Sequence, residues 1–243
     1  MVDAYLHGKV DRISPEAPVP VVALRKRENK LGGAANVALN LLSFGTETIL
    51  CSVIGHDRQG EELLNLMLNA GLQTNGILKS EERITTTKFR IIGNKMQILR
   101  VDEETDTDLS ENESSQFLIL VNKLIETQKP DIIILQDYNK GVLTGKVIQE
   151  VIRLACNESI PVVADPKKKN FSAYKSIRLF KPNLKEISEG LKIEVDPKST
   201  ENLQNAASQL HVNQDIDLVM ITLSEYGVFL SQRTSEGNKS RAT

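Results

Sequence analysis

Two glycines directly before an apolar helical run are the first residues of this sequence whose types and spacing suggest chemistry. Gly32 and Gly33 precede residues 34–42, where apolar side chains recur at helical spacing, and Gly45 marks the end of the run. Glycines at the start of a helix let a ligand approach the backbone closely, and the N–H groups there attract electron-rich oxygens. Asn36, one turn into the helix, adds an amide that can donate and accept hydrogen bonds. The segment therefore indicates either a polar-ligand site or, on the glycines alone, a flexible turn before an ordinary core helix.

Polar clusters follow four apolar stretches in the second half of the chain. The stretches span residues 131–136, 160–164, 177–180 and 218–223, and the clusters span residues 137–141, 165–169, 183–186 and 222–227. Helical patterns alternate with the stretches, so the sequence predicts a parallel sheet covered by helices on both faces. Ligands of such sheets bind beyond the carboxyl ends of the strands. The four clusters together therefore predict a polar-ligand site at one edge of the sheet.

Two of these clusters also have an ordinary structural explanation. Asn183 and Glu186 have the spacing of a capping box, in which each side chain caps the backbone of the other residue. The three lysines at 167–169 are typical of a solvated surface, although Lys167, two residues after Asp165, could reach a phosphate. The residues alone leave both explanations open.

The first half of the chain predicts mainly strands. Residues 1–30 indicate extended structure, and the three prolines between residues 15 and 20 favour an edge strand or a projecting arm. Residues 85–92 and 96–101, around a turn at 93–95, predict a hairpin. In the whole chain we expect further helices over 61–70, 110–127, 144–156 and 201–210, the first capped by Asp57 and the second by a capping box of Ser110 and Glu113.

Composition limits the class of protein and its partners. At 243 residues the chain has the size of one large α/β domain, or of a domain with a small appendage. A net charge of −2 and a pI near 6.0 do not provide the positive electrostatic field that would attract nucleic acid or anionic lipid. Cys51 and Cys156 lack metal-binding spacing, no apolar run has membrane-spanning length, and the N-terminus lacks the apolar core of a signal peptide. We expect a soluble, cytoplasmic protein without a nucleic-acid or membrane partner.

Several motifs together resemble a known enzyme family. Gly32-Gly33-Ala-Ala-Asn36, with Asp3 upstream and Lys181-Pro182-Asn183-x-x-Glu186 downstream, resembles the ribokinase-type (PfkB) carbohydrate kinases. The heptose-phosphate kinase branch, the kinase of ADP-heptose synthesis, is more closely similar, because its motifs occur here in the same order at 12–21, 87–90, 100–102, 137–141 and 165–167. The resemblance covers residues 1 to about 231. It implies a ribokinase-like three-layer α/β/α fold with a doubly wound, mostly parallel sheet and a small β-sheet lid.

The resemblance also implies roles for individual residues of a sugar-phosphate site. Four residues would hold the sugar hydroxyls: Asp3, Gly32, Gly33 and Asn36. The phosphate of the substrate would lie against three cations on the facing strands of the hairpin: Lys88, Arg90 and Arg100. Three cations suit a dianion, although a solvated hairpin face explains them nearly as well.

A second set of residues is implied to bind ATP and Mg²⁺. Asn183 and Glu186 would orient Mg²⁺ and its waters at the ATP phosphates, with Glu186 as the metal residue, because Mg²⁺ prefers oxygen ligands and retained waters. Thr222 and Gly227 would border the nucleotide, and Lys167 would reach a phosphate.

The implied reaction transfers the γ-phosphoryl group of ATP to the anomeric hydroxyl of D-glycero-D-manno-heptose 7-phosphate, in the biosynthesis of ADP-heptose for the lipopolysaccharide core. In relatives the lid, here about residues 10–30 and 85–102, also builds a dimer clasp, which implies a homodimer. Two other interpretations remain open. The chain could be a non-catalytic sugar-binding or dimerising remnant, or another member of the family such as a ribokinase or fructokinase.

The sequence departs from the family pattern at both ends. The family carries a Gly-Ala-Gly-Asp motif after the segment that ends near Ser231; its Asp is the catalytic base, and its helix start is the anion hole for the transferred phosphoryl group. The sequence has no such motif, so the base is expected beyond Thr243, and residues 232–243 are predicted to be a disordered polar tail. Relatives also place a buried strand before the position of Asp3. The interpretation is an incomplete kinase domain over residues 1–231.

We predict negligible kinase turnover for the 243-residue polypeptide. A positioned base contributes about 10²–10⁴-fold to a rate and an anion-hole donor about 10²–10³-fold, and the sequence lacks the motif that supplies both. A steady-state assay with ATP, Mg²⁺ and heptose 7-phosphate measures this turnover, with an active sugar kinase as the control for the coupling system. A rate clearly above the protein-free rate would contradict the prediction.

Overall fold

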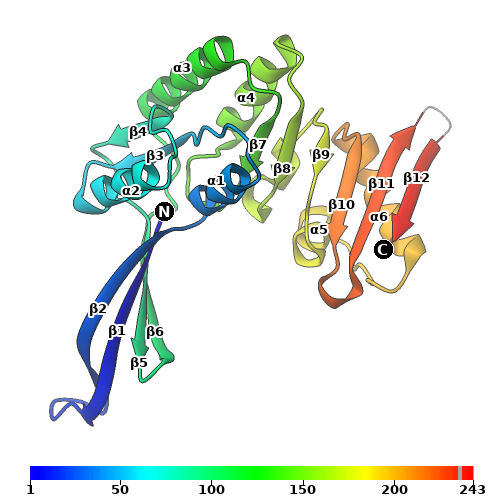
Figure 1. Cartoon of the computed structure of the whole chain (residues 1–243). Coiled ribbons are helices and arrows are strands. Elements are labelled where there is room, and N and C mark those ends of the chain that lie inside the picture. The colour runs from blue at the N-terminus through cyan, green and yellow to red at the C-terminus, as the bar shows by residue number, and fades with distance from the viewer. Residues whose placement is uncertain (235–236, 243) are drawn as a thin grey trace. The chain divides into compact units, whose positions relative to one another are not determined.

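The chain divides into two units, Met1–Asp106 and Thr107–Thr243. The computed structural model describes residues 1–234 and 237–242 (Figure 1). The elements of the first unit are β1 (Val2–Ile13), β2 (Pro20–Leu31), α1 (Ala34–Ser43), β3 (Ser52–Gly55), α2 (Arg58–Asn69), β4 (Ile77–Ser80), β5 (Thr87–Gly93) and β6 (Met96–Glu103).

A four-stranded sheet of order β2-β1-β5-β6 projects from the helices of the first unit (Figure 1). β1 pairs antiparallel with β2 and parallel with β5, and β5 and β6 form a hairpin. The predictions of extended structure near the N-terminus, of an edge strand and of the hairpin are confirmed. Pro20 begins the edge strand β2, where a missing N–H is tolerated. β1 already begins at Val2, so the sheet extends beyond the predicted lid segments of about 10–30 and 85–102.

Strand alternation gives this sheet one charged face. Residues paired across neighbouring strands project to the same side, and the registers Asp3↔Lys88, Tyr5↔Arg90 and Arg90↔Arg100 link three strands. This charged face consists of Asp3, Tyr5 and His7 of β1, Glu28 and Lys30 of β2, Lys88 and Arg90 of β5, and Arg100 and Asp102 of β6.

The opposite side of the sheet is apolar and remains exposed over its outer part. The registers Leu6↔Ile91 and Ile91↔Leu99 place these side chains together. The apolar face is formed by Leu6, Leu24, Phe89, Ile91, Met96, Leu99 and Val101, and Arg27 lies on the same side over the ring of Phe89. Leu24 is 57% exposed, Leu99 55% and Met96 72%. Such a contiguous apolar surface is typical of an interaction site.

The helices of the first unit form its core together with the inner ends of β1 and β2. Its buried members are Val2, Leu31, Ala35, Ala38, Leu50, Ile54, Leu63, Met67 and Leu72. α1 begins directly after Gly33, as predicted. α2 is capped by Asp57 as predicted, although it begins at Arg58 rather than Glu61. β3 and β4 pair in a separate two-stranded parallel sheet.

The second unit contains a six-stranded sheet of order β12-β11-β10-β9-β8-β7. Its elements are α3 (Glu111–Gln128), β7 (Ile133–Gln136), α4 (Gly145–Asn157), β8 (Val162–Asp165), the 3₁₀ turn η1 (Lys168–Ala173), β9 (Leu179–Phe180), α5 (Leu184–Leu191), α6 (Thr200–Asn213), β10 (Leu218–Thr222), the 3₁₀ turn η2 (Ser224–Tyr226), β11 (Val228–Thr234) and β12 (Gly237–Ala242). The four helices predicted over 61–70, 110–127, 144–156 and 201–210 are therefore all present, with shifted ends.

The central strands of this sheet are parallel, as the apolar stretches predict. β7 pairs with β8, β8 with β9, and β9 with β10, all in parallel. α6 packs against β10, β11 and β12, and α3 packs against α4 (Figure 1). The parallel order brings the carboxyl ends of four strands to one edge. Among residues 1–234 and 237–242, no helix is long and apolar enough to cross a membrane.

The prediction of a disordered tail over 232–243 is wrong for the residues described there. β11 continues to Thr234, and β12 pairs antiparallel with it from Phe229↔Ala242 to Thr234↔Gly237. Gln204 Nε2 of α6 also donates to Ser240 Oγ at 2.9 Å. Ser235, Glu236 and Thr243 lie outside the described residues. A polar edge strand needs backbone partners rather than an apolar pattern, so composition does not reveal it.

Replacing Asp57 tests the cap that starts α2. The carboxylate accepts the N–H of Gly60 at 2.7 Å with Oδ1 and the N–H of Thr85 at 2.7 Å with Oδ2. We expect Asp57→Ala to lower the free energy of unfolding by about 1 kcal/mol at pH 7 in urea denaturation, because a helix cap is lost. Asp57→Asn, which keeps one acceptor oxygen, is the matched control with a smaller loss.

The difference in the free energy of unfolding between the wild type and Asp57→Ala should depend on pH. Burial opposes the charge of Asp57, but backbone hydrogen bonds from Thr85 and Gly60 outweigh it and lower the pKa of the carboxyl below its ordinary value of 3.8. A lowered folded-state pKa gives stability that is present above pH 3.8 and is lost as the pH falls through that lower pKa. A constant difference between the wild type and Asp57→Ala down to pH 2 would contradict this assignment.

Candidate functional site

The structure brings Asp3 and the paired glycines together. Gly32 directly follows β2, and its backbone N–H donates to the carbonyl of Met1 at 3.0 Å. A Cβ atom on Gly32 would lie 2.7 Å from Cγ of Asp3, so a larger residue would displace the carboxylate. Gly33, the N-cap of α1, has φ 56° and ψ −133°, a conformation that essentially only glycine adopts. The glycine pair is therefore required by this geometry and is not merely a flexible turn.

Asn36 lies in the first turn of α1 with an exposed side chain. Within the described part of the chain, no side chain caps the start of this helix. The side chain of Asp3 is 17% exposed, so solvent reaches it as well. All four predicted sugar-site residues thus lie at or beside the start of α1, and none of the polar ones is sealed in the core.

The three predicted phosphate cations lie on the charged face, but each one is already paired. Arg90 Nη1 donates to Asp3 Oδ1 at 2.7 Å. Lys88 Nζ donates to Asp102 at 2.6 Å and to Glu104 at 3.0 Å. Arg100 Nε donates to Asp102 at 3.0 Å. An incoming phosphate would therefore exchange with carboxylates rather than fill an unneutralised positive site.

These ion pairs keep the cations charged. Burial opposes the charge of Lys88, but the hydrogen bonds that Lys88 donates to Asp102 and Glu104 outweigh it and raise the pKa of Lys88 above its ordinary value of 10.5. The hydrogen bond to Asp3 likewise raises the pKa of Arg90. Both side chains are thus present as cations at neutral pH, as phosphate binding needs.

Sequence reasoning missed Tyr5 on the same face. The Arg90 guanidinium carbon and Lys30 Nζ each lie 5.2 Å from the centre of the Tyr5 ring, and His7 stacks on the ring with a centroid distance of 6.3 Å. Cation–π contacts of this kind restrict the cation. The alternation of Asp3, Tyr5 and His7 along one strand is the signal that could have found it.

In the second unit, the four predicted polar clusters follow four neighbouring parallel strands. The N–H of Thr222, at the end of β10, donates to the carbonyl of Pro182 at 3.1 Å, and Asn183 pairs with Thr222 in a parallel bridge. Gly227 has φ 86°, and its carbonyl accepts the N–H of Leu223 at 2.9 Å, which closes the loop after β10. The predicted residues Asn183, Thr222 and Gly227 therefore lie on adjacent strand ends.

Both explanations of Asn183 and Glu186 hold at once. Asn183 Oδ1 accepts the N–H of Glu186 at 2.8 Å, and Glu186 Oε2 accepts the N–H of Asn183 at 3.0 Å, which is a capping box at the start of α5. Glu186 Oε1 points away from this box and forms an ion pair with Lys167 Nζ. The cap thus fixes the carboxylate while one oxygen remains directed toward a cation.

The structure separates Lys167 from the two lysines that follow it. Lys168 pairs with Glu189 at 3.6 Å, and Lys169 pairs with Asp108 at 2.7 Å. Burial opposes the charge of Lys167, but the hydrogen bond and field of Glu186 outweigh it and raise the pKa of Lys167. Lys167 therefore faces the strand edge through Glu186, and the prediction that it reaches a phosphate stays a prediction.

Two aspartates at this strand edge, Asp137 and Asp165, are held in place by hydrogen bonds and an ion pair. Asp137 is 1% exposed and accepts hydrogen bonds from Tyr174 Oη at 2.9 Å and from the Asn139 N–H at 2.6 Å. Asp165 accepts from Gln136 Nε2 at 3.0 Å and pairs with Lys181 at 3.0 Å. Sequence reasoning placed the two aspartates at the edge but missed the hydrogen bonds from Tyr174 and Gln136, which lie 37 and 29 positions away from the aspartates that they bond.

Glu186 fits the role of a magnesium-orienting residue. It is 6% exposed, its orientation is fixed by the capping box, and a lysine ammonium already stands at its outward oxygen. In the described part of the chain, no group of three or more His, Cys, Asp or Glu side chains is arranged to hold a metal ion. Mg²⁺ usually binds through one or two carboxylates, substrate phosphates and waters, so a single well-placed carboxylate is consistent with it.

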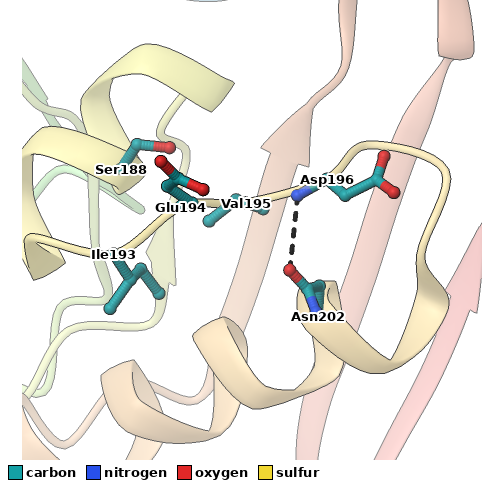
Figure 2. Close-up of a pocket in the computed structure, with 6 residues that line it drawn as sticks. All are labelled: Ser188, Ile193, Glu194, Val195, Asp196 and Asn202. Atoms are coloured by element: carbon teal, nitrogen blue, oxygen red, sulfur yellow. Dashed lines mark hydrogen bonds between the residues drawn. The ribbon is translucent and has the colours of Figure 1, made fainter.

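A surface pocket of the second unit lies elsewhere. It has a volume of about 470 Å³ between the end of α5 and the start of α6 (Figure 2). Its lining residues are Ser188, Ile193, Glu194, Val195, Asp196 and Asn202, and the Asp196 N–H donates to Asn202 Oδ1 at 3.4 Å. None of the predicted nucleotide residues lines this pocket, so the chemistry of the strand edge and not this hollow defines the candidate site.

Comparison with known proteins decides the family. The family model described as "pfkB family carbohydrate kinase" matches residues 2–242. The chain belongs to this family. PfkB carbohydrate kinases transfer a phosphoryl group to a hydroxyl group of a sugar.

Curated relatives of this PfkB chain are about twice as long. The chain is 41% identical over 228 residues to "Bifunctional protein HldE" of Aliarcobacter butzleri (strain RM4018), which covers 94% of this chain and 47% of that protein. It is 40% identical to proteins of the same name from Helicobacter pylori (strain J99 / ATCC 700824) and Methylobacillus flagellatus, with 48% and 47% of those proteins covered. The chain thus spans about half the length of these relatives.

Solved structures confirm the ribokinase-like α/β fold. The tetrameric inhibited form of phosphofructokinase-2 from Escherichia coli matches with a TM-score of 0.75 at 18% identity, covering 98% of this chain and 75% of that one. Arabidopsis thaliana ribokinase complexed with ribose and ATP matches with a TM-score of 0.66 at 14% identity, covering 99% and 74%. At these identities the likeness shows the fold alone.

Proposed function

We propose that this PfkB chain binds D-glycero-D-manno-heptose 7-phosphate and ATP in the cytoplasm, as the kinase part of ADP-heptose synthesis. The reaction would transfer the γ-phosphoryl group of ATP to the anomeric hydroxyl. Identity of about 40% to proteins named HldE over 94% of the chain supports the branch, together with the branch motifs in the sequence.

One observation carries the substrate assignment. Arg90 and Asp3 lie 2.7 Å apart on the charged face, directly beside Gly32. An acidic side chain at a glycine-rich helix start suits sugar hydroxyls, and an arginine suits a phosphate oxygen. A phosphate can exchange with the carboxylates that pair with these cations, whereas ribose and fructose carry no anionic group that could do so, so the arrangement favours a sugar phosphate over ribose or fructose.

In this proposal each residue has a defined task. Asp3 accepts hydrogen bonds from sugar hydroxyls, Asn36 donates and accepts them, and Gly32 and Gly33 let the sugar approach the backbone. Lys88, Arg90 and Arg100 bind the phosphate that the substrate already carries. These contacts orient the acceptor, which is most of what phosphoryl transfer requires of a protein.

The strand edge of the second unit would hold the nucleotide. Lys167 binds a phosphate, Thr222 and Gly227 border the nucleotide, and Asn183 and Glu186 orient the waters of Mg²⁺. When bound, Mg²⁺ would supply positive charge that neutralises the phosphates. The capping box at α5 supports this proposal because it fixes Glu186 without using its outward oxygen.

The apolar face supports a homodimer through the β-sheet lid. Leu24, Met96 and Leu99 are each more than half exposed on this face. A second copy of the chain would bury the same apolar patch in an isologous interface, as most homodimers do. The charged face on the other side of the sheet would remain available to the sugar phosphate.

Arg90→Ala tests the substrate assignment. We expect the affinity for heptose 7-phosphate to fall about tenfold or more in isothermal titration calorimetry, because a charge-assisted hydrogen bond is lost. Arg27→Ala is the matched control: Arg27 lies on the opposite face of the sheet, over the ring of Phe89, and its loss should leave the affinity unchanged. Equal affinities of Arg90→Ala and wild type, or tighter binding of ribose or fructose than of heptose 7-phosphate, would refute the assignment.

Leu99→Arg tests the dimer. The wild type should be a dimer at micromolar concentration in size-exclusion chromatography with light scattering, and Leu99→Arg a monomer, because a charge would be buried in an apolar interface. Ile119→Arg is the control, since Ile119 is 70% exposed on α3 of the other unit and should leave the dimer intact. A wild-type monomer would end the proposal of a dimer, whatever the variants do.

A further inference from the structure

The ammonium group of Lys167 contacts the outward oxygen of Glu186, the residue that the proposed function assigns to Mg²⁺. Lys167 Nζ contacts Glu186 Oε1, and the Asn183 N–H donates to Glu186 Oε2 at 3.0 Å. Both oxygens of Glu186 therefore have a donor. Because the capping box holds Oε2 in place, any new cation must compete with Lys167 for Oε1.

The surroundings of Lys167 are strongly acidic. The fields of Glu186, Asp165 and Asp137 all act on its ammonium group. Asp165 pairs with Lys181 at 3.0 Å, whereas Asp137 is 1% exposed and accepts hydrogen bonds from three neutral donors, Tyr174 Oη, the Asn139 N–H and Asn170 Nδ2. This position favours a cation, and Lys167 is the cation that occupies it.

The neighbouring lysines cannot take this role as the chain is arranged. Lys168 and Lys169 are turned to Glu189 and Asp108 respectively. The side chain of Lys167 is still 39% exposed, so its ammonium group can leave Glu186 without unpacking the core. A flexible four-carbon stem lets the same group move from a carboxylate to a phosphate.

We propose that Lys167 occupies the cation position at Glu186 in the nucleotide-free protein and moves to a nucleotide phosphate when the divalent cation arrives. The inference rests on the proposed function, since it takes Glu186 as the residue that orients the metal. An ammonium group and a hydrated divalent ion cannot share one carboxylate oxygen without strong repulsion. The nucleotide removes this conflict because its phosphates accept the displaced ammonium group.

Two consequences follow for binding. The divalent cation alone binds Glu186 weakly, because it must displace Lys167 into solvent. The cation together with a nucleotide binds well, because Lys167 exchanges one anionic partner for another. Lys167 is thus a positioning residue that couples metal binding to nucleotide binding.

Titration with Mn²⁺ in the absence of nucleotide tests the proposal. Mn²⁺ accepts the same oxygen ligands as Mg²⁺, and the signal of the free ion in electron paramagnetic resonance reports binding to the full chain. We expect Lys167→Gln to bind Mn²⁺ about tenfold more tightly than the wild type, because a neighbouring positive charge is removed. Lys168→Gln is the matched control one residue along the chain, and its affinity should equal that of the wild type.

The outcomes are distinct. Equal Mn²⁺ affinity of Lys167→Gln and wild type overturns the proposal, and so does a gain that persists in the double variant Lys167→Gln with Glu186→Gln. If Lys167→Gln fails to fold by circular dichroism, Lys167→Arg, which keeps the charge, must bind Mn²⁺ as weakly as the wild type; tighter binding overturns the proposal. If the wild type binds neither heptose 7-phosphate nor ATP, the proposed function is refuted instead. The two failures can be told apart because the Mn²⁺ titration contains neither ligand.

Discussion

Internal ion pairs hold the charged residues of both predicted ligand sites. Arg90 is paired with Asp3 on the charged face, and Lys167 is paired with Glu186 at the strand edge of the other unit. In each pair, both members are residues expected to bind a ligand. The remaining elements of the two units serve to hold these pairs in register, so each site is preorganised by the protein's own opposite charge before any ligand is present.

The backbone around each pair explains why it forms. Parallel pairing of β1 with β5 places Arg90 opposite Tyr5, so its guanidinium reaches Asp3 along the neighbouring strand. Gly32 leaves room for the Asp3 carboxylate, and no other residue could do so without a contact of 2.7 Å. At the other site the capping box of α5 turns Glu186 toward the end of β8, where Lys167 begins its loop. Strand pairing and helix capping, both local features, thus determine the charge pattern.

Much of this arrangement can be predicted from local sequence, and the rest depends on contacts between distant segments. The glycine-capped helix, the 85–101 hairpin, the parallel strands and the capping box at Asn183 follow from periodicity and turn residues. β12 could not be predicted, because its polar residues become a strand only by pairing with β11. The partner of Arg90 was equally hidden: Asp3 and Arg90 are separated by 87 positions, and no spacing rule connects them.

Paired cations are compatible with tight ligand binding because of where the pairs lie. The side chains of Asp3 and Arg90 are 17% and 21% exposed, so water reaches both, and a solvent-accessible ion pair contributes only about 0–1 kcal/mol. A phosphate dianion offers Arg90 a stronger, bidentate partner, and a sugar hydroxyl can replace one bond of Asp3. Replacing the Asp3–Arg90 ion pair by contacts with such a ligand would therefore cost little free energy and would form stronger hydrogen bonds. A ligand with a hydroxyl but no phosphate would separate Asp3 from Arg90 and leave the arginine without an equivalent partner, so under the proposed function the ion pair would discriminate in favour of ligands that carry both groups.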